Sequence, residues 1–167
     1  VTRVLHHISS QYDIKISELS FDKNTFSYDL ERIKYQFADA APDLVIISHA
    51  SNVCGVVAPI IEIFQLAKKH SAITVADMCQ PMGLVDIDLG GPEVDYAVFA
   101  GHKTLYAPLG VAGFICADNA NAAPLLFGGT GIDSANPNLP ESVPEKYEVG
   151  SSNIAAIAGL NAALKWN

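Results

Sequence analysis

The sequence predicts an α/β fold, a three-layer α/β/α arrangement built around a mostly parallel sheet. Short apolar runs of the kind that form buried strands recur along the chain. Amphipathic stretches with helical spacing lie between them, and such an alternation of strands and helices is typical of a parallel sheet. The chain has no internal repeat and no linker rich in Ser, Gly or Pro, so we expect one continuous unit.

The first elements are predicted from two kinds of pattern. Residues 15–20 alternate apolar and polar side chains, which predicts a strand. Ser27 is placed to cap a helix over residues 28–39, with Ile33 and Phe37 on its inner face.

The later elements follow from the same patterns. Residues 44–48 form a continuous apolar run, which predicts a strand buried on both faces. Pro59 suits the first turn of a helix that extends to His70. Further strands are predicted over residues 72–76, 95–99 and 111–116, and a closing helix over residues 153–166. We expect the inner face of the closing helix to carry Ile157, Leu160 and Leu164.

Composition excludes several classes of partner. The 167 residues include 10 lysines and arginines against 18 aspartates and glutamates, which gives a formal charge of −8. This charge disfavours nucleic acid and anionic membranes as partners, because both are negatively charged themselves. No apolar run approaches the ~18 residues that a membrane span needs. Cys54, Cys79 and Cys116 have no metal-type spacing, so we expect no metal site and buried, reduced thiols in a cytoplasmic protein.

Polar residues follow three consecutive predicted strands. Asn52 lies after the first of these strands, Asp77 follows the second, and Lys103 follows the third. The carboxyl ends of parallel strands meet at one sheet edge, so we expect these side chains to converge. Singly, Asp77 is also typical of a turn or helix cap, and Lys103 of a solvated turn. Together, an amine that reacts with aldehydes and a carboxylate that holds a pyridinium nitrogen are the protein half of pyridoxal-phosphate chemistry.

Five motifs in collinear order carry a family resemblance. They are SHASNVCGVVAPI, ADMCQPMG, FAGHKTLYAPLGVAGF, FGGTG and YEVGSSN. This pattern resembles the class V aminotransferase group, and within it the cysteine desulfurase and selenocysteine lyase branch of fold-type I pyridoxal-phosphate enzymes. The resemblance covers nearly the whole chain. Asp-x-x-Gln or Gly-His-Lys alone would be a weak signal, whereas five motifs in order are specific.

The resemblance implies roles at the cofactor ring for four residues. Lys103 matches the catalytic lysine that forms a Schiff base with the cofactor and later moves protons. Asp77 matches the partner of the pyridinium nitrogen, and Gln80 the side chain near the ring hydroxyl. Asn52 matches the asparagine near the ring and the incoming substrate.

At the cofactor phosphate, the resemblance implies two contacts and the loss of one. His102 matches a phosphate-contacting histidine. Thr130 looks like the residue that reaches the phosphate of the other subunit in the family's dimers. Ala100 stands where many members carry a phosphate-binding serine or threonine, so we expect one contact fewer. We interpret Cys54 and Cys79 as packing residues.

Members of the family are much longer than this chain. We therefore expect residues 1–167 to be the central part of the pyridoxal-phosphate-binding large domain, without its N-terminal segment and without the small C-terminal domain. The resemblance places the arginine that binds the substrate carboxylate, and the nucleophilic cysteine of desulfurases, in that C-terminal domain. Arg3 and Arg32 match neither role.

The function that the resemblance implies is that of a pyridoxal-phosphate-dependent, cysteine desulfurase-like enzyme in its full-length form. Such an enzyme converts cysteine to alanine and persulfide sulfur, which implies a small amino-acid substrate, a homodimer and a sulfur-acceptor protein. Two alternatives stay open: another class V enzyme (an aminotransferase, β-lyase or epimerase), or a catalytically silent fragment or oligomerisation module. We expect the isolated segment to be inactive.

Overall fold

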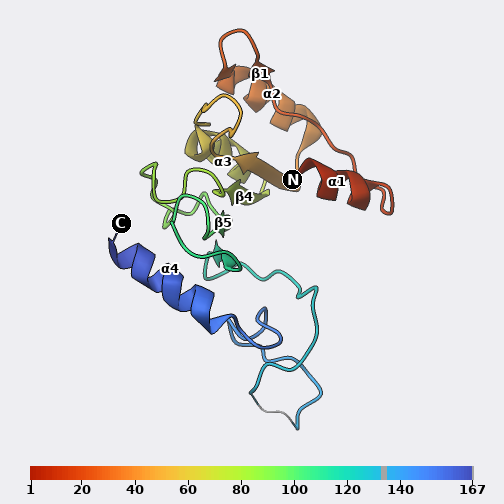
Figure 1. The fold of residues 1–167 in the computed structure, drawn as a ribbon. Coiled ribbons are helices and arrows are strands. Elements are labelled where there is room, and N and C mark those ends of the chain that lie inside the picture. Colours follow the sequence, from red (N-terminus) through yellow and green to blue (C-terminus); the bar gives the residue numbers. More distant parts are fainter. Residues whose placement is uncertain (133–134, 167) are drawn as a thin grey trace.

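The computed structural model describes residues 1–132 and 135–166, and a four-stranded sheet lies at the centre of this part of the chain (Figure 1). The strands are β3 (Leu44–Ser48), β4 (Ile73–Asp77), β5 (Tyr96–Ala100) and β6 (Ala112–Cys116), in that spatial order. β3, β4 and β5 run parallel, and β6 runs antiparallel to β5. This mostly parallel sheet with flanking helices confirms the predicted α/β class.

Four helices and a short hairpin accompany the sheet in the described residues. The helices are α1 (Thr2–Ser9), α2 (Leu30–Ala40), α3 (Ile60–Lys68) and α4 (Ile154–Trp166). The hairpin pairs β1 (Phe21–Asp22) with β2 (Ser27–Tyr28). α2 and α3 bury the predicted apolar stripes, in a core that includes Ile33, Phe37, Ile63 and Phe64.

The two faces of the sheet differ in burial. Because side chains alternate along a strand, Val45, Ile47 and Ala76 share the face that joins the core with α2 and α3; we call this the core face. Leu44 and Ile73 lie on the opposite face and are 47% and 50% exposed. The prediction that residues 44–48 are buried on both faces is therefore wrong. The physical reason is that, within the described residues, α2 and α3 cover one face of β3 and β4.

The front of the chain differs from prediction in two places. Residues 15–20 form no strand, because they have no partner strand. The Gln36 side chain of α2 holds this segment instead: its Oε1 accepts from Ser20 N at 2.9 Å and its Nε2 donates to Glu18 O at 3.2 Å. The α2 helix begins at Leu30 rather than at residue 28, because Asp29 provides the cap and accepts from Arg32 N at 3.0 Å.

The closing helix α4 forms where predicted but presents another face. Ile157 and Leu164 are exposed, and Ala156 is its buried residue. The helix approaches the turn after β5 through Gly159, where an added Cβ would lie 2.5 Å from the Pro108 ring. Such a close approach requires a small residue at the contact, so the large apolar residues point elsewhere. The inward positions predicted for Ile157 and Leu164 are wrong for this reason.

Candidate active site

The carboxyl ends of the three parallel strands meet at one edge of the sheet, as predicted. A cavity of about 370 Å³ lies at this edge, within the size range of small-molecule sites. It is lined by the strand-end residues Ser48 and Asp77, by the following loops and by the β1–β2 hairpin. The lining residues with polar side chains are Tyr28, Ser48, Ser51, Asn52, Cys54, Asp77, Cys79, Gln80 and Lys103.

Asp77 occupies the centre of this arrangement. It is the last residue of β4 and pairs in register with Ser48 at the end of β3. Its Oδ2 accepts from Ser48 Oγ at 3.4 Å, and its Oδ1 accepts from Cys79 N at 3.1 Å. These two hydrogen bonds orient the carboxylate at the mouth of the cavity.

Lys103 lies in the turn that follows β5. Its N donates to Ala100 O at 3.3 Å, and its carbonyl accepts from Tyr106 N at 3.0 Å, so the turn has internal hydrogen bonds on both sides of the lysine. Gly101 makes this turn possible, because an added Cβ would lie 2.9 Å from Val111 Cγ1 and 3.0 Å from Val111 O. The turn delivers the lysine side chain to the same cavity as Asp77.

The two cysteines of the cavity have different environments. Cys54 is exposed, and a hydrogen bond with the Ser51 hydroxyl, assisted by Val56, lowers the pKa of its thiol. Burial raises the pKa of Cys79, and Asp77 raises it further, while the charge of Lys103 acts in the opposite direction. The interpretation of Cys54 as a buried packing residue is wrong, because the loop after β3 turns outward and lines the cavity.

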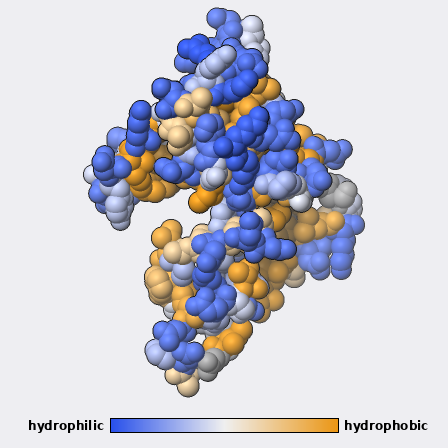
Figure 2. All heavy atoms as spheres, turned by 180° about the vertical axis from the view of Figure 1, so that it is seen from behind, coloured by the Kyte–Doolittle hydropathy of each residue, from blue (hydrophilic) through white to orange (hydrophobic). Residues whose placement is uncertain are grey.

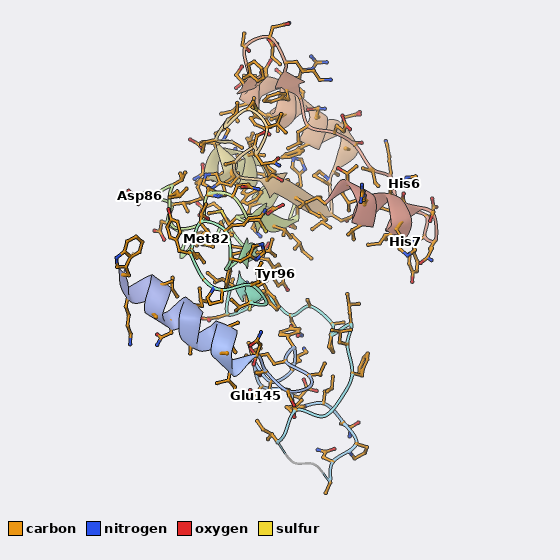
Figure 3. All side chains as sticks on the ribbon, viewed as in Figure 1. His6, His7, Met82, Asp86, Tyr96 and Glu145 are labelled. Carbon is orange, nitrogen blue, oxygen red and sulfur yellow. The ribbon has the colours of Figure 1, made fainter. Side chains whose placement is uncertain are left out.

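The two residues predicted at the cofactor phosphate lie outside this cavity. His102 is exposed and does not line it. Thr130 lines a separate hollow of about 800 Å³, formed by residues within 121–132 and 136–146. The resemblance assigned Thr130 to the site of another subunit, and that assignment stays a prediction. Figure 3 places His6 and His7 on α1, away from the sheet, so these histidines do not join the site either.

Sequence reasoning missed several residues of the site, three of which carry a hydroxyl or an aromatic ring at its wall. Ser48, Phe21 and Tyr28 all line the cavity. The hydroxyl of Ser48, at the last position of an apolar strand, was a usable signal. Phe21 and Tyr28 come from the β1–β2 hairpin, whereas the sequence pattern places Tyr28 in a helix. Their rings lie 5.0 Å apart between centroids, and burial raises the pKa of Tyr28.

Sequence comparison identifies the family. The profile described as Aminotransferase class-V matches residues 2–167. The chain belongs to the class V aminotransferase family. One relative, a probable cysteine desulfurase of Methanothermobacter thermautotrophicus, is 33% identical over 132 residues, which cover 77% of this chain and 33% of the relative.

Solved structures show the same relationship. The class V chain has a TM-score of 0.84 and 25% identity with the apo structure of a cysteine desulfurase from Thermococcus onnurineus NA1, covering 97% of this chain and 41% of that one. SspA in complex with cysteine gives a TM-score of 0.64 at 26% identity, over 79% of this chain and 36% of that one. The chain spans between a third and about half of the length of the first curated relatives that it matches.

The class V family uses pyridoxal phosphate, and the residues of the cavity fit the ring side of this cofactor. Lys103 provides an amine, Asp77 a carboxylate, and Asn52 and Gln80 provide amides. Among the described residues that line the cavity, Lys103 is the one cation and Asp77 the one carboxylate. Within the described residues, no group of His, Cys, Asp or Glu side chains forms a metal site, and no helix could cross a membrane.

Proposed function

We propose that the protein to which this chain belongs is a pyridoxal-phosphate-dependent cysteine desulfurase, which converts cysteine to alanine and delivers the sulfur as a persulfide. The observation that carries the proposal is the convergence of Lys103, Asp77, Asn52 and Gln80 on one cavity at the carboxyl edge of the sheet. The cysteine desulfurases among its relatives and structural neighbours support this choice of reaction within the class V family.

Each of these residues has a role that its chemistry allows. When bound, the cofactor supplies a carbonyl carbon that reacts with amines and a ring that accepts electrons. The Asp77 carboxylate would hold a proton on the ring nitrogen. The Lys103 amine would hold the cofactor at rest and would then remove and return the proton at the substrate α-carbon. The Asn52 and Gln80 amides would orient the ring and the incoming amino acid.

We also propose that the protein works as a homodimer and passes sulfur to an acceptor protein. The exposed apolar residues Leu125, Leu126 and Phe127, which are 91%, 69% and 74% exposed, support a dimer interface next to Thr130. The rear view in Figure 2 shows apolar side chains gathered over the lower half of the molecule. The three free cysteines support a reducing, cytoplasmic location.

The test is a product assay on the full-length protein, loaded with pyridoxal phosphate and incubated with cysteine. The proposal predicts alanine and sulfide in equal amounts when a reducing thiol is present. A keto acid without sulfide would indicate transamination instead. Lys103→Ala should abolish turnover, whereas Lys69→Ala, which replaces an exposed lysine of the α3 C-terminus, should leave it unchanged.

A further inference from the structure

His49 is a buried, ionisable residue that the proposed reaction does not use. It follows β3 directly and is 4% exposed, and with Thr74 it is one of two buried polar residues in the described chain. Burial lowers the pKa of its imidazole, so the ring is neutral near pH 7. A buried imidazole needs a structural reason, because an apolar residue would fill the same space without a polar group to satisfy.

Two contacts of His49 reach the end of β4, at Asp77 and Met78, while its carbonyl accepts from Ala58 N at 2.7 Å. His49 N donates to Asp77 O at 3.0 Å, which extends the β3–β4 ladder by one residue. Its ring Nδ1 lies 3.2 Å from the sulfur of Met78, the residue that follows Asp77. On the far side, Met78 N donates to Val98 O of β5 at 2.8 Å. The end of β4 is therefore fixed between its two neighbouring strands.

Successive side chains at the ends of β3 and β4 point to opposite faces of the sheet. Ser48 and Asp77 form one register pair, and their side chains meet on the cavity side. His49 and Met78 are one residue further along, so their side chains point to the core face instead. Met78 is fully buried there. The Asp77 carboxylate thus makes its contacts on the cavity side, while His49 contacts the Asp77 carbonyl and the Met78 side chain at the core face.

We propose that His49 is a positioning residue for Asp77: its neutral ring donates from Nδ1 to the Met78 sulfur and so fixes the direction in which the Asp77 carboxylate enters the cavity. This inference rests on the proposed function only in its second test. A residue that holds a binding group in place affects ligand affinity through that group. Residues that hydrogen-bond to metal ligands, for example, change the affinity for the metal without touching it.

The first test uses the cofactor-free, full-length protein and does not depend on the proposed function. NMR of the ring nitrogens should show a neutral His49 with its proton on Nδ1. His49→Leu should shift the carboxyl carbon signal of Asp77, and His49→Asn, whose amide nitrogen can replace Nδ1, should restore it. Thr74→Val is the matched control, because it removes the other buried polar side chain, which lies on the core face of β4 three residues before Asp77. A proton on Nε2, or an unchanged Asp77 signal in His49→Leu, would overturn the proposal.

The second test is a double-mutant cycle on the affinity for pyridoxal phosphate. We expect His49→Leu to weaken the Kd about tenfold, in the range of 10–100-fold for outer-shell partners. In an Asp77→Asn background, His49→Leu should raise the Kd less than about twofold, because His49 acts on binding through the Asp77 carboxylate. Equal losses in both backgrounds would contradict the proposal. If His49→Leu folds poorly, Met78→Leu, which keeps the volume of the side chain, replaces it. We expect Met78→Leu to raise the Kd by a smaller factor, again mainly when Asp77 is present. If the parent protein binds no cofactor, the proposed function fails, and the first test alone decides the role of His49.

Discussion

Ser48 and Asp77 end two neighbouring parallel strands at the same register position, and the Ser48 hydroxyl donates to the Asp77 carboxylate at 3.4 Å. Both side chains of this pair line the cavity at the carboxyl edge of the sheet. The strand ends place a carboxylate at the mouth of a cavity, and the turn after β5 brings Lys103 to the same place.

The length of this hydrogen bond predicts its importance for cofactor binding. At 3.4 Å it is weak, so Ser48→Ala should weaken the Kd for pyridoxal phosphate by only about two- to fivefold, or about 0.5–1 kcal/mol. Asp77→Asn removes the charge itself and should weaken binding by more than tenfold, on the order of 1.4 kcal/mol or more. Titration of the cofactor absorption gives both values. An equal loss in the two variants would mean that the hydroxyl, not the carboxylate charge, determines affinity.

Gly101 gives a prediction about the turn that carries Lys103. Gly101→Ala places a methyl group against Val111 and Ala107, so the turn must shift and the lysine must move from its position. We expect the fraction of protein that retains bound cofactor after gel filtration to fall at least several-fold. Gly90→Ala is the control, because Gly90 lies outside the cavity and an added Cβ there meets only the end of the Asp88 side chain, at 3.2 Å. Full cofactor retention in Gly101→Ala would show that the turn tolerates the shift.

An ion pair at the opposite edge of the sheet makes the stability of the fold depend on acid pH. Lys68 forms an ion pair with Asp95, whose Oδ2 also accepts from Thr74 N at 2.7 Å. Burial raises the pKa of Asp95, but the hydrogen bonds from Lys68 and Thr74 and the charge of Lys68 together bring it below its usual value. A carboxyl with a lowered pKa stabilises the fold above its unfolded-state pKa, near 3.8, and this contribution is lost as the pH falls through the lower, folded-state pKa.

Asp95→Asn tests this stabilisation. We expect the variant to lose about 1–3 kcal/mol of unfolding free energy at pH 7, because a half-buried Lys68 loses its partner. The difference from the parent should shrink as the pH falls below about 4, since the parent then loses its own charge. Urea unfolding at several pH values measures both effects. The surface pair Glu31–Lys34 is the control, and Glu31→Gln should cost less than about 0.5 kcal/mol. A pH-independent loss in Asp95→Asn would exclude the charge as its cause.

Cys54 should be the first thiol to react with an alkylating reagent. It is exposed and its pKa is lowered, whereas burial raises the pKa of Cys79. Mass spectrometry after brief iodoacetamide treatment at neutral pH should find the label on Cys54. Because Cys54 lines the cavity in which we propose that the cofactor binds, added pyridoxal phosphate should slow this reaction. Ser51→Ala should slow labelling by raising the pKa of the thiol. Earlier labelling of Cys79 or Cys116 would contradict this description of the site.

Much of the fold and half of the site can be predicted from the sequence, and the differences have physical causes. Continuous apolar runs identify β3, β4 and β5, and parallel topology then places Asn52, Asp77 and Lys103 together. Residues 15–20 show that alternation without a partner strand makes no sheet. The α4 helix has apolar residues on several sides, so its sequence predicts the helix but not the side that packs against the rest of the chain.

Residues brought to the site by tertiary contacts are harder to predict. Tyr28 enters the cavity because the two-residue strand β2 takes the place of the predicted helix start, and Asp29 caps the helix two residues after the predicted cap, Ser27. Cys54 depends on the outward course of a loop, which composition does not encode. His49 could be singled out in the sequence as a strand-end residue, but its contact with Met78 follows only from the register of β3 and β4.

The central claim is that Lys103 is the residue that holds the cofactor. The most direct measurement is borohydride reduction of the full-length, pyridoxal-phosphate-loaded protein, followed by peptide mass spectrometry. Reduction fixes the linkage between amine and cofactor so that the modified residue can be identified. We predict a single modified peptide with the cofactor on Lys103. Modification of another lysine, such as Lys68 at the opposite edge of the sheet, with Lys103 unmodified, would contradict the account.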